Sequence, residues 1–339
     1  MSRFDVSVIV VNYNCHNTLK DCIKSILLSE AVGELLLVDN ASTDKSMDLI
    51  EEYIADVRLK IIRLNRNIGL AKARNLAAAK TSSDYLAFTD ADTIVDPEWL
   101  QEPCFLLETH KEIGAVQCEI LSWKHLHKIT FGEERSRGID WKTMPEEMLN
   151  SSRRILFPNG VAFIIRRDVW DLVKGFDAAL FVGNDDVDLG IRLWLSGYEV
   201  ICSSEGIVYH DGGHLRRRKD IAPIFKFHGY KNMLIIWTKD LQAGTLVKQV
   251  LPFSLLYPLV TFLDAGVWGV TGLISFLESL PSILVRRHDV QQLRKISDNK
   301  IIPMMHRAGT LPIQLFTNDF RIFYKYILRR IKAMVARAR

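Results

Sequence analysis

The sequence predicts an α/β fold in which a parallel β-sheet carries helices on both faces. Val6–Val11 is a run of β-branched apolar residues interrupted by Ser7 alone, which is typical of a strand buried on both faces. Thr18–Leu28 places its apolar residues at helical spacing. This alternation of strand and helix patterns continues through about residue 92, and such a rhythm favours parallel strands joined by crossover helices.

The elements that follow repeat this alternation. In chain order they are a strand at Leu35–Val38, a helix from about Lys45 capped by Thr43 or Asp44, a strand at Ile61–Leu64, an Ala-rich helix at Gly69–Ala79, and a strand at Tyr85–Phe88. Each predicted strand ends in polar residues. These are Asn12, Tyr13 and Asn14 after the first strand, Asp39 after the second, Asn67 after the third, and Asp90 and Asp92 after the fourth. Open sheets of this kind bind ligands at the carboxyl ends of their strands, so we expect the site there.

Two common phosphate-binding motifs are missing after the first strand. The sequence has no GxGxxG and no GxxxxGK[ST] pattern there, which argues against a dehydrogenase or a P-loop enzyme. A nucleotide diphosphate bound by this sheet would need another partner. A metal ion held by carboxylates is the natural substitute.

Asp90-Ala91-Asp92 offers two carboxylates at a strand end, and hard cations such as Mg²⁺ or Mn²⁺ prefer oxygen ligands that they share with phosphates. The alternative is a simple turn with a helix cap. His210, in Val208–His214, is a candidate third metal ligand or phosphate contact, or else an ordinary loop histidine.

A second acidic cluster, Asp185-Asp186-Val187-Asp188, leads into an apolar helical pattern at Leu189–Tyr198. Acidic residues stabilise a helix N-terminus, but three acids in four residues exceed what capping requires. Mutual repulsion raises the pKa of neighbouring carboxyls, which suits a general base.

Charge divides the chain into two predicted domains, 1–215 and 216–339. The first has 23 Lys and Arg against 33 Asp and Glu, a net charge of −10, and the second has 21 against 7, a net charge of +14. The five cysteines form no CxxC pair, and we expect reduced thiols in a cytosolic compartment. The N-terminus enters a strand too quickly for a signal peptide, so none is expected.

The second domain contains a 28-residue stretch, Val250–Leu277, in which Asp264 is the one charged residue. Its length permits a membrane span, but Asp264 is costly in a bilayer and Pro258 would kink a helix. We therefore favour two shorter interfacial helices over a span, with a soluble helical hairpin as the remaining alternative. The tail Phe320–Arg339 reads as a basic amphipathic helix, which also favours an anionic membrane surface. No nucleic-acid-binding fold is recognisable.

Four sequence segments, by their order and spacing, resemble those of the family 2 inverting glycosyltransferases. The resemblance is greatest to the rhamnosyltransferase-like branch of that family. The four segments are VSVIVVNYN, LLLVDNASTDKS, LNRNIGLAKARNLAAAKTSSDYLAFTDADTIVDPEWL and PNGVAFIIRRDVWDLVKGFDAALFVGNDDVDLGIRLWLSGY. They cover roughly residues 5–214. The resemblance implies a Rossmann-like GT-A nucleotide-sugar-binding domain followed by a mainly helical, membrane-associating region. The family's usual Glu-Asp-Val-Asp-Leu appears here with Asp185 in place of Glu.

The resemblance also implies roles for individual residues. The implied donor-binding residues are Val11, Asn12, Tyr13, Asp39, Asn67, Arg74 and Asp90, the implied acceptor-side residues are Gly160 and Asp188, and the implied metal ligands are Asp92 and His210. Asp186 would be the catalytic base, with Asp185 the other candidate. The reaction would be a single displacement by an acceptor hydroxyl on the anomeric carbon, assisted by Mg²⁺ or Mn²⁺. Gly160 would let the acceptor sugar approach the backbone.

The predicted partners are a nucleotide sugar, a glycan or polyprenyl-linked acceptor, and the cytoplasmic face of the cell membrane, where the protein would be peripheral or monotopic. A different class of function is also compatible with the sequence, namely a non-catalytic GT-A-fold membrane partner of a glycan-assembly complex. The sequence predicts neither the sugar nor the oligomeric state.

Overall fold

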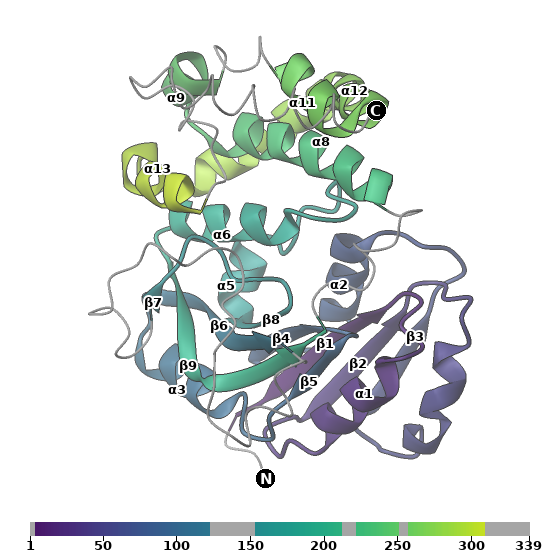
Figure 1. Ribbon diagram of the computed structural model, residues 1–339. Helices are drawn as coiled ribbons and strands as arrows, with labels where there is room; N and C mark the ends of the chain where they lie inside the picture. Colours follow the sequence, from purple (N-terminus) through teal and green to yellow (C-terminus); the bar gives the residue numbers. More distant parts are fainter. Residues whose placement is uncertain (1–3, 123–152, 212–221, 251–256, 309–339) are drawn as a thin grey trace. The chain divides into compact units, whose positions relative to one another are not determined.

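The computed structural model describes residues 4–122, 153–211, 222–250 and 257–308. The chain divides into two compact units. The first, here called unit 1, comprises Met1–Phe181 and Asp185–His214, and the second, unit 2, comprises Val182–Asn184 and Leu215–Arg339 (Figure 1). The predicted tail helix at 320–339 lies outside the described residues.

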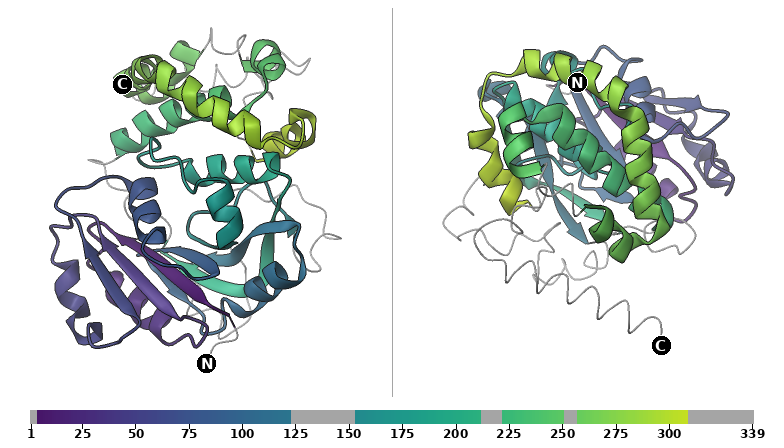
Figure 2. Two further views of the ribbon diagram at one scale, coloured as in Figure 1. Left: turned by 180° about the vertical axis from the view of Figure 1, so that it is seen from behind. Right: turned by 90° about the horizontal axis from the view of Figure 1, so that it is seen from above.

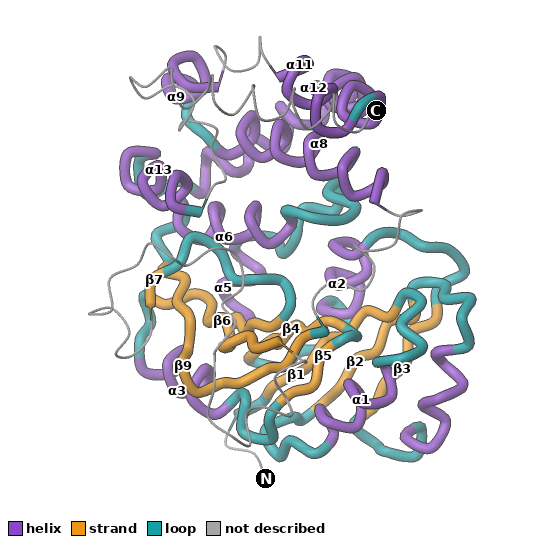
Figure 3. The backbone as a smooth tube through the Cα atoms, viewed as in Figure 1, coloured by secondary structure: helices purple, strands orange, loops and turns teal. Residues whose placement is uncertain are grey.

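Unit 1 is built on one mixed sheet (Figure 3). Its strands are β1 (Val6–Asn12), β2 (Glu34–Asp39), β3 (Leu59–Arg63), β4 (Tyr85–Asp90), β5 (Thr93–Val95), β6 (Ile113–Ser122), β7 (Arg153–Arg154), β8 (Ala162–Arg166) and β9 (Glu199–His210). The order across the sheet is β3-β2-β1-β4-β8-β6-β9-β5, and β7 pairs with β9.

The prediction of a parallel sheet is confirmed for β1 to β4, and β6 also pairs in parallel with β9, but the sheet as a whole is mixed. β3, β2, β1 and β4 pair in parallel, but β8 runs antiparallel to both β4 and β6. The reason is that the alternation of strand and helix ends after β4. Only two residues separate β4 from β5, which is too short for a crossover, and β5 pairs antiparallel with β9 instead.

Helices cover both faces of this sheet, as predicted (Figure 2). The α1 helix (Leu19–Leu27) and the α3 helix (Gln101–Thr109) belong to one apolar core. The α2 helix (Leu70–Ala78), the α5 helix (Arg167–Leu172) and the α6 helix (Asp185–Leu195) belong to the other. Since both cores meet the sheet, β1 is buried along its whole length, which explains its largely apolar sequence.

The helix predicted from about Lys45 is a 3₁₀-helix, η1, at Ser46–Tyr53. Neither Thr43 nor Asp44 caps it as predicted: Lys45 stands at its N-terminus with a left-handed backbone (φ 60°) and no side-chain cap. The Asp44 carboxylate instead accepts the Ser46 backbone N–H at 3.0 Å in a local turn.

Unit 2 is helical. Its elements are α8 (Ala222–Asp240), α9 (Ala243–Thr245), a π-helical turn η4 (Leu246–Val250), α11 (Tyr257–Ala265), α12 (Val267–Leu293) and α13 (Asp298–Arg307). The predicted kink at Pro258 is wrong, because Pro258 lies in the first turn of α11, where a missing N–H costs no helical bond. The break falls instead at Gly266, which has φ 60°.

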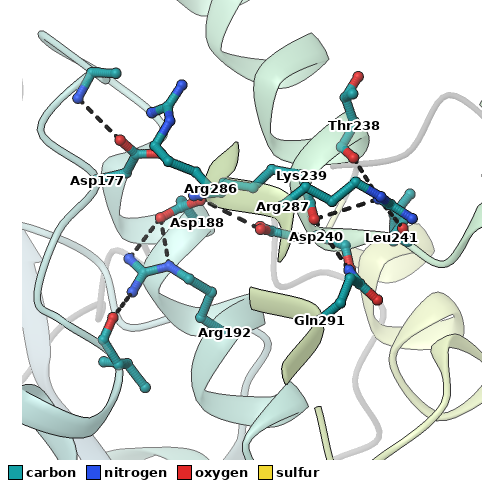
Figure 4. A network of polar contacts seen from close by, with 12 residues as sticks. Asp177, Asp188, Arg192, Thr238, Lys239, Asp240, Leu241, Arg286, Arg287 and Gln291 are labelled. Carbon is teal, nitrogen blue, oxygen red and sulfur yellow. Dashed lines mark hydrogen bonds and ion pairs between the residues drawn. The ribbon is translucent and has the colours of Figure 1, made fainter. Parts of the chain in front are cut away.

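The α12 helix is long and apolar enough to cross a membrane by length and composition. It packs along α8, and Arg287 of α12 donates to the backbone oxygens of Thr238 and Leu241 at 2.5 Å each (Figure 4). These bonds satisfy carbonyls at the C-terminal end of α8 that have no partner within the helix.

Candidate functional site

The candidate site lies at the carboxyl ends of the strands of unit 1. Asp90 is the last residue of β4, and Asp92 follows two residues later. His210 is the last residue of β9, and the antiparallel pairing of β9 with β5 sets it opposite Thr93. The ligand atoms of Asp90, Asp92 and His210 lie within 4.8 Å of one another. The fold thus brings together the two predicted metal ligands and adds Asp90, which the sequence had placed in donor binding.

His210 is held against Asp92. Its Nε2 lies 3.3 Å from Asp92 Oδ1, and both side chains are 18% exposed. Burial lowers the pKa of His210, but the hydrogen bond and negative charge of Asp92 outweigh burial, and the net shift is upward. The imidazole is therefore fixed in orientation by a carboxylate.

These three residues fit a hard divalent cation. Two carboxylates and one imidazole form a mixed oxygen and nitrogen set, which suits Mn²⁺ and is compatible with Mg²⁺. The set is half-buried, and three protein ligands are fewer than the six that Mg²⁺ or Mn²⁺ takes in octahedral coordination. Burial raises the pKa of Asp90, and the charge of Asp92 adds to this, whereas Arg74 opposes it. Two close carboxylates with one basic neighbour are an arrangement that a cation stabilises.

Arg74, on α2, is buried beneath the site, with its side chain 1% exposed. Its Nη2 donates to Asp90 Oδ1 at 2.7 Å and to the Gly160 carbonyl at 2.5 Å. Its Nη1 lies 3.6 Å from Asp185 Oδ2. The guanidinium also lies over the Phe176 ring, 5.5 Å from its centroid. Arg74 therefore holds protein carboxylates together at the site, and its placement near the donor stays a prediction.

Gly160 connects Arg74 to the acidic cluster. Its carbonyl accepts from Arg74, and its N–H donates to Asp186 Oδ2 at 3.1 Å. A Cβ at this position would lie 3.1 Å from Arg74 Nη1 and 3.7 Å from Asp186. The space beside Gly160 thus faces these two protein side chains, and the close approach of an acceptor sugar to this backbone stays a prediction.

The first two acids of the α6 cluster, Asp185 and Asp186, differ in environment. Asp186 is half-buried, whereas Asp185 is 4% exposed. Burial raises the pKa of Asp185 to about 7, the charge of Asp186 adds to the shift, and Arg74 opposes it. Consecutive residues on a helix point about 100° apart, so one acid faces the interior while its neighbour faces the site.

Asp188 is placed differently from its predicted role on the acceptor side. Its side chain has no exposed surface, and Oδ2 accepts from Arg192 Nη2 at 2.6 Å and from Arg192 Nε at 2.8 Å. Arg192 also donates to the Val173 carbonyl (Figure 4). An acid enclosed in this way cannot reach an acceptor, and it anchors α6 inside unit 1.

At the end of β1, Val11 and Asn12 are buried, at 9% and 0% exposure. The Asn12 amide donates to the Ser46 hydroxyl at 2.8 Å and to the Ser42 hydroxyl at 3.0 Å. It also lies 3.5 Å from Asp39 Oδ1. The Asn12 side chain thus orders the loop after β2, and the assignment of these two residues to the donor pocket stays a prediction. Tyr13 is half-buried.

The loop after β2 is ordered by side-chain bonds. Asp39, 7% exposed, accepts the Ser42 N–H at 3.1 Å, so most of its surface is already covered. Asn67 accepts from the Asn40 amide at 3.0 Å and from the Gly69 N–H at 2.9 Å, and Asn40 accepts from Ile68. Sequence reasoning missed Asn40, although its position directly after Asp39 at a strand end was the available signal.

Comparison with known proteins identifies the family of the domain that carries this site. Residues 7–171 match the family model described as "Glycosyl transferase family 2". The chain contains a glycosyl transferase family 2 domain. It has the GT-A fold: the mannosyltransferase PcManGT from Pyrobaculum calidifontis, solved with GDP-Man and Mn²⁺, aligns with a TM-score of 0.53 at 17% identity, covering 94% of this chain and 89% of that one.

Two bacterial relatives of this family 2 domain are similar over about two thirds of the chain. The O-antigen biosynthesis protein RfbC of Myxococcus xanthus is 29% identical over 234 residues, covering 64% of this chain and 18% of the relative. The succinoglycan biosynthesis protein ExoO of Rhizobium meliloti is 28% identical over 217 residues, covering 61% of this chain and 60% of the relative. In both cases the similarity spans less than two thirds of the relative's own length. The rhamnosyltransferase-like branch stays a prediction.

Proposed function

We propose that this chain is an inverting glycosyltransferase that moves a sugar from a nucleotide sugar to an acceptor hydroxyl. The observation that carries the proposal is a continuous set of contacts from Asp90 through Arg74 and the Gly160 peptide to Asp186. It joins a metal-binding group of residues to a half-buried carboxylate. The metal-binding candidates at the Asp90 end suit a nucleotide diphosphate. The Asp186 carboxylate at the other end suits an acceptor hydroxyl that must lose a proton.

We assign the general base to Asp186 and a supporting role to Asp185. Asp186 keeps exposed surface, and its Oδ2 is oriented by the Gly160 N–H. Asp185 is buried against Arg74 and has no route to an acceptor. A base must reach the proton that it removes, so geometry selects Asp186.

The remaining roles follow from placement. Asp90, Asp92 and His210 would hold the cation, which when bound would stabilise the negative charge on the departing diphosphate. Asp39, Tyr13 and Asn67 would border the nucleoside pocket, as the family resemblance implies. Arg74 keeps Asp90 and the Gly160 peptide in fixed positions, so that the base and the metal ligands keep their separation.

For the acceptor we propose a growing bacterial-type polysaccharide or a lipid-linked glycan at the cytoplasmic face of a membrane. The O-antigen and succinoglycan functions in the names of the two relatives support the polymer class. The charge of +14 in residues 216–339 supports an anionic surface nearby. Residues 1–215 would be the catalytic domain and 216–339 the membrane-associating region.

The test is release of nucleoside diphosphate from a panel of nucleotide sugars, with Mn²⁺ or Mg²⁺, by the wild type and by Asp92→Ala. Asp171→Asn is the control, because Asp171 is an acid that is 63% exposed on α5. We expect metal-dependent release from one donor, lost in Asp92→Ala and kept in the control. A folded protein for which calorimetry detects neither donor nor metal binding would contradict the proposal and favour the non-catalytic partner.

A further inference from the structure

The α12 helix has two apolar faces. One face contains Gly269, Gly272, Phe276, Ile283 and Val290, all buried. Their spacing of three, four and seven residues puts them on one side of the helix. Gly272 lies against the backbone of α8, where an added Cβ would stand 2.9 Å from the Phe227 carbonyl. This face is therefore the packing face of α12 within unit 2.

The second apolar face of α12 is exposed, and we call it the outer stripe. Its members are Val267 (63% exposed), Ile274 (51%), Leu277 (52%), Leu284 (56%) and Val285 (70%). Steps of seven, three, seven and one residues keep these side chains within about a third of the helix circumference. Two further apolar side chains on α11 are exposed as well, Leu259 at 51% and Phe262 at 52%. The core helix of a soluble protein would bury such side chains. In the most apolar 18-residue stretch of α12, however, only 17% is buried.

A membrane span is a poor explanation for the outer stripe, because α12 runs beside α8 in the same direction. Gly272 meets α8 at Phe227, and Arg287 meets it at Thr238 and Leu241. If α12 crossed a bilayer, α8 would cross with it at the same level. That would bring Lys226, Lys231 and Lys239 into the hydrocarbon layer, where charged side chains are strongly disfavoured.

The charge of unit 2 matches an anionic surface. Among its described residues, the exposed Lys and Arg side chains are Lys248, Lys295, Lys300 and Arg307, and the exposed acidic side chain is Glu278. These four cations lie outside α12, which itself carries Glu278, so the charge contribution comes from unit 2 as a whole. An apolar stripe on a net cationic unit favours an anionic lipid surface by both burial and charge.

We infer that the outer stripe of α12, together with Leu259 and Phe262 of α11, is a docking surface for an anionic lipid bilayer, on which α12 lies in the plane of the membrane. This inference deepens the proposed function by naming the surface that would bring the enzyme to a lipid-linked acceptor. It selects the interfacial alternative over the span.

The experiment is flotation of the full-length protein with vesicles of phosphatidylcholine, with and without phosphatidylglycerol. We compare the wild type with Leu277→Glu/Leu284→Glu. The matched control is Ile54→Glu/Val57→Glu, which makes the same change at two exposed apolar positions of unit 1, at 52% and 94% exposure. We expect binding that phosphatidylglycerol strengthens, a roughly tenfold or larger loss for the stripe variant, and no loss for the control.

Three further measurements keep the inference falsifiable. Circular dichroism should show both variants folded, since the substituted side chains are exposed. Alkaline carbonate should strip the wild type from the vesicles, whereas a spanning helix would resist it. Diphosphate release in vesicle-free solution should be equal in the wild type and the stripe variant, which separates a failure of docking from a failure of the proposed activity.

The inference is overturned if the stripe variant floats like the wild type or if carbonate fails to extract the protein. It is also overturned if the wild type ignores vesicles and sedimentation shows a dimer that the stripe variant makes monomeric. In that case the partner of the outer stripe is a second copy of the chain.

Discussion

The candidate site of unit 1 and the outer stripe of unit 2 depart from ordinary burial in opposite ways. Unit 1 encloses charged side chains beneath its site, among them Arg74 at 1%, Asp185 at 4% and Asp188 at 0% exposure. Unit 2 leaves apolar side chains in contact with solvent along one side of α12, up to 70% at Val285. Each departure from the usual distribution is costly, and each falls where we propose binding. The comparison teaches that both buried charge and exposed apolar surface can mark functional regions.

The largest effect is expected from removing the buried cation of unit 1. Arg74→Met would leave Asp90 and Asp185 without their basic neighbour, and we expect a loss of about 3–5 kcal/mol in the free energy of unfolding. Urea denaturation measures this. Arg58→Met is the control, since Arg58 pairs with Asp56 at a site where both side chains are more than a quarter exposed. An equal loss in the two variants would contradict the role of Arg74.

A loss of similar size, in activity and not in stability, is expected at the base. Asp186→Asn should lower kcat by about 10²–10⁴-fold while donor binding is kept, because the amide cannot accept the acceptor proton. Single-turnover sugar transfer and donor calorimetry measure the two quantities. If the variant kept wild-type kcat, the assignment of the base to Asp186 would be wrong.

A pH-dependent effect of up to about 4 kcal/mol is expected from Asp185. Its pKa is raised from 3.8 to about 7, so the folded state holds a proton that the unfolded state releases. The contribution of Asp185 to stability is therefore largest below about pH 4 and is lost as the pH rises toward 7. The asparagine variant should lose this dependence.

Thermal unfolding from pH 4 to pH 8 measures this contribution of Asp185 as the difference in stability between the wild type and Asp185→Asn. Asp171→Asn, at an exposed position, should track the wild type. Parallel stability curves for the wild type and Asp185→Asn would show that Asp185 is ionised in the folded protein throughout this range.

The smallest effects sharpen the comparison within one helix. Ile283 is fully buried and Leu284, its neighbour, is 56% exposed. In solution, Ile283→Ala should cost about 2–4 kcal/mol and Leu284→Ala within about 0.5 kcal/mol. Chemical denaturation without lipid measures both. Equal costs would mean that the outer stripe is covered in solution, which would remove the contrast between the two faces of α12.

The sequence by itself determined the first half of the fold. Largely apolar runs identified β1, β2 and β4, because strands buried on both faces leave little room for polar side chains. The short run Ile61–Leu64 identified β3 at the sheet edge. The sequence also located the polar strand ends with Asp39, Asp90 and Asp92, since the carboxyl ends of parallel strands meet at one edge. The charge contrast between the two halves was visible in composition alone.

Only the tertiary structure decided what the acidic cluster and the glycine do. Asp185, Asp186 and Asp188 are alike in sequence, and their separate environments arise because Arg74 and Arg192 reach them from different directions. The antiparallel pairing of β9 with β5 sets His210 opposite Thr93, which lies 117 positions earlier in the chain, and no local pattern specifies such a long-range contact. Packing of elements distant in sequence, which local propensity does not encode, therefore placed His210 beside Asp92 and Gly160 between Arg74 and Asp186.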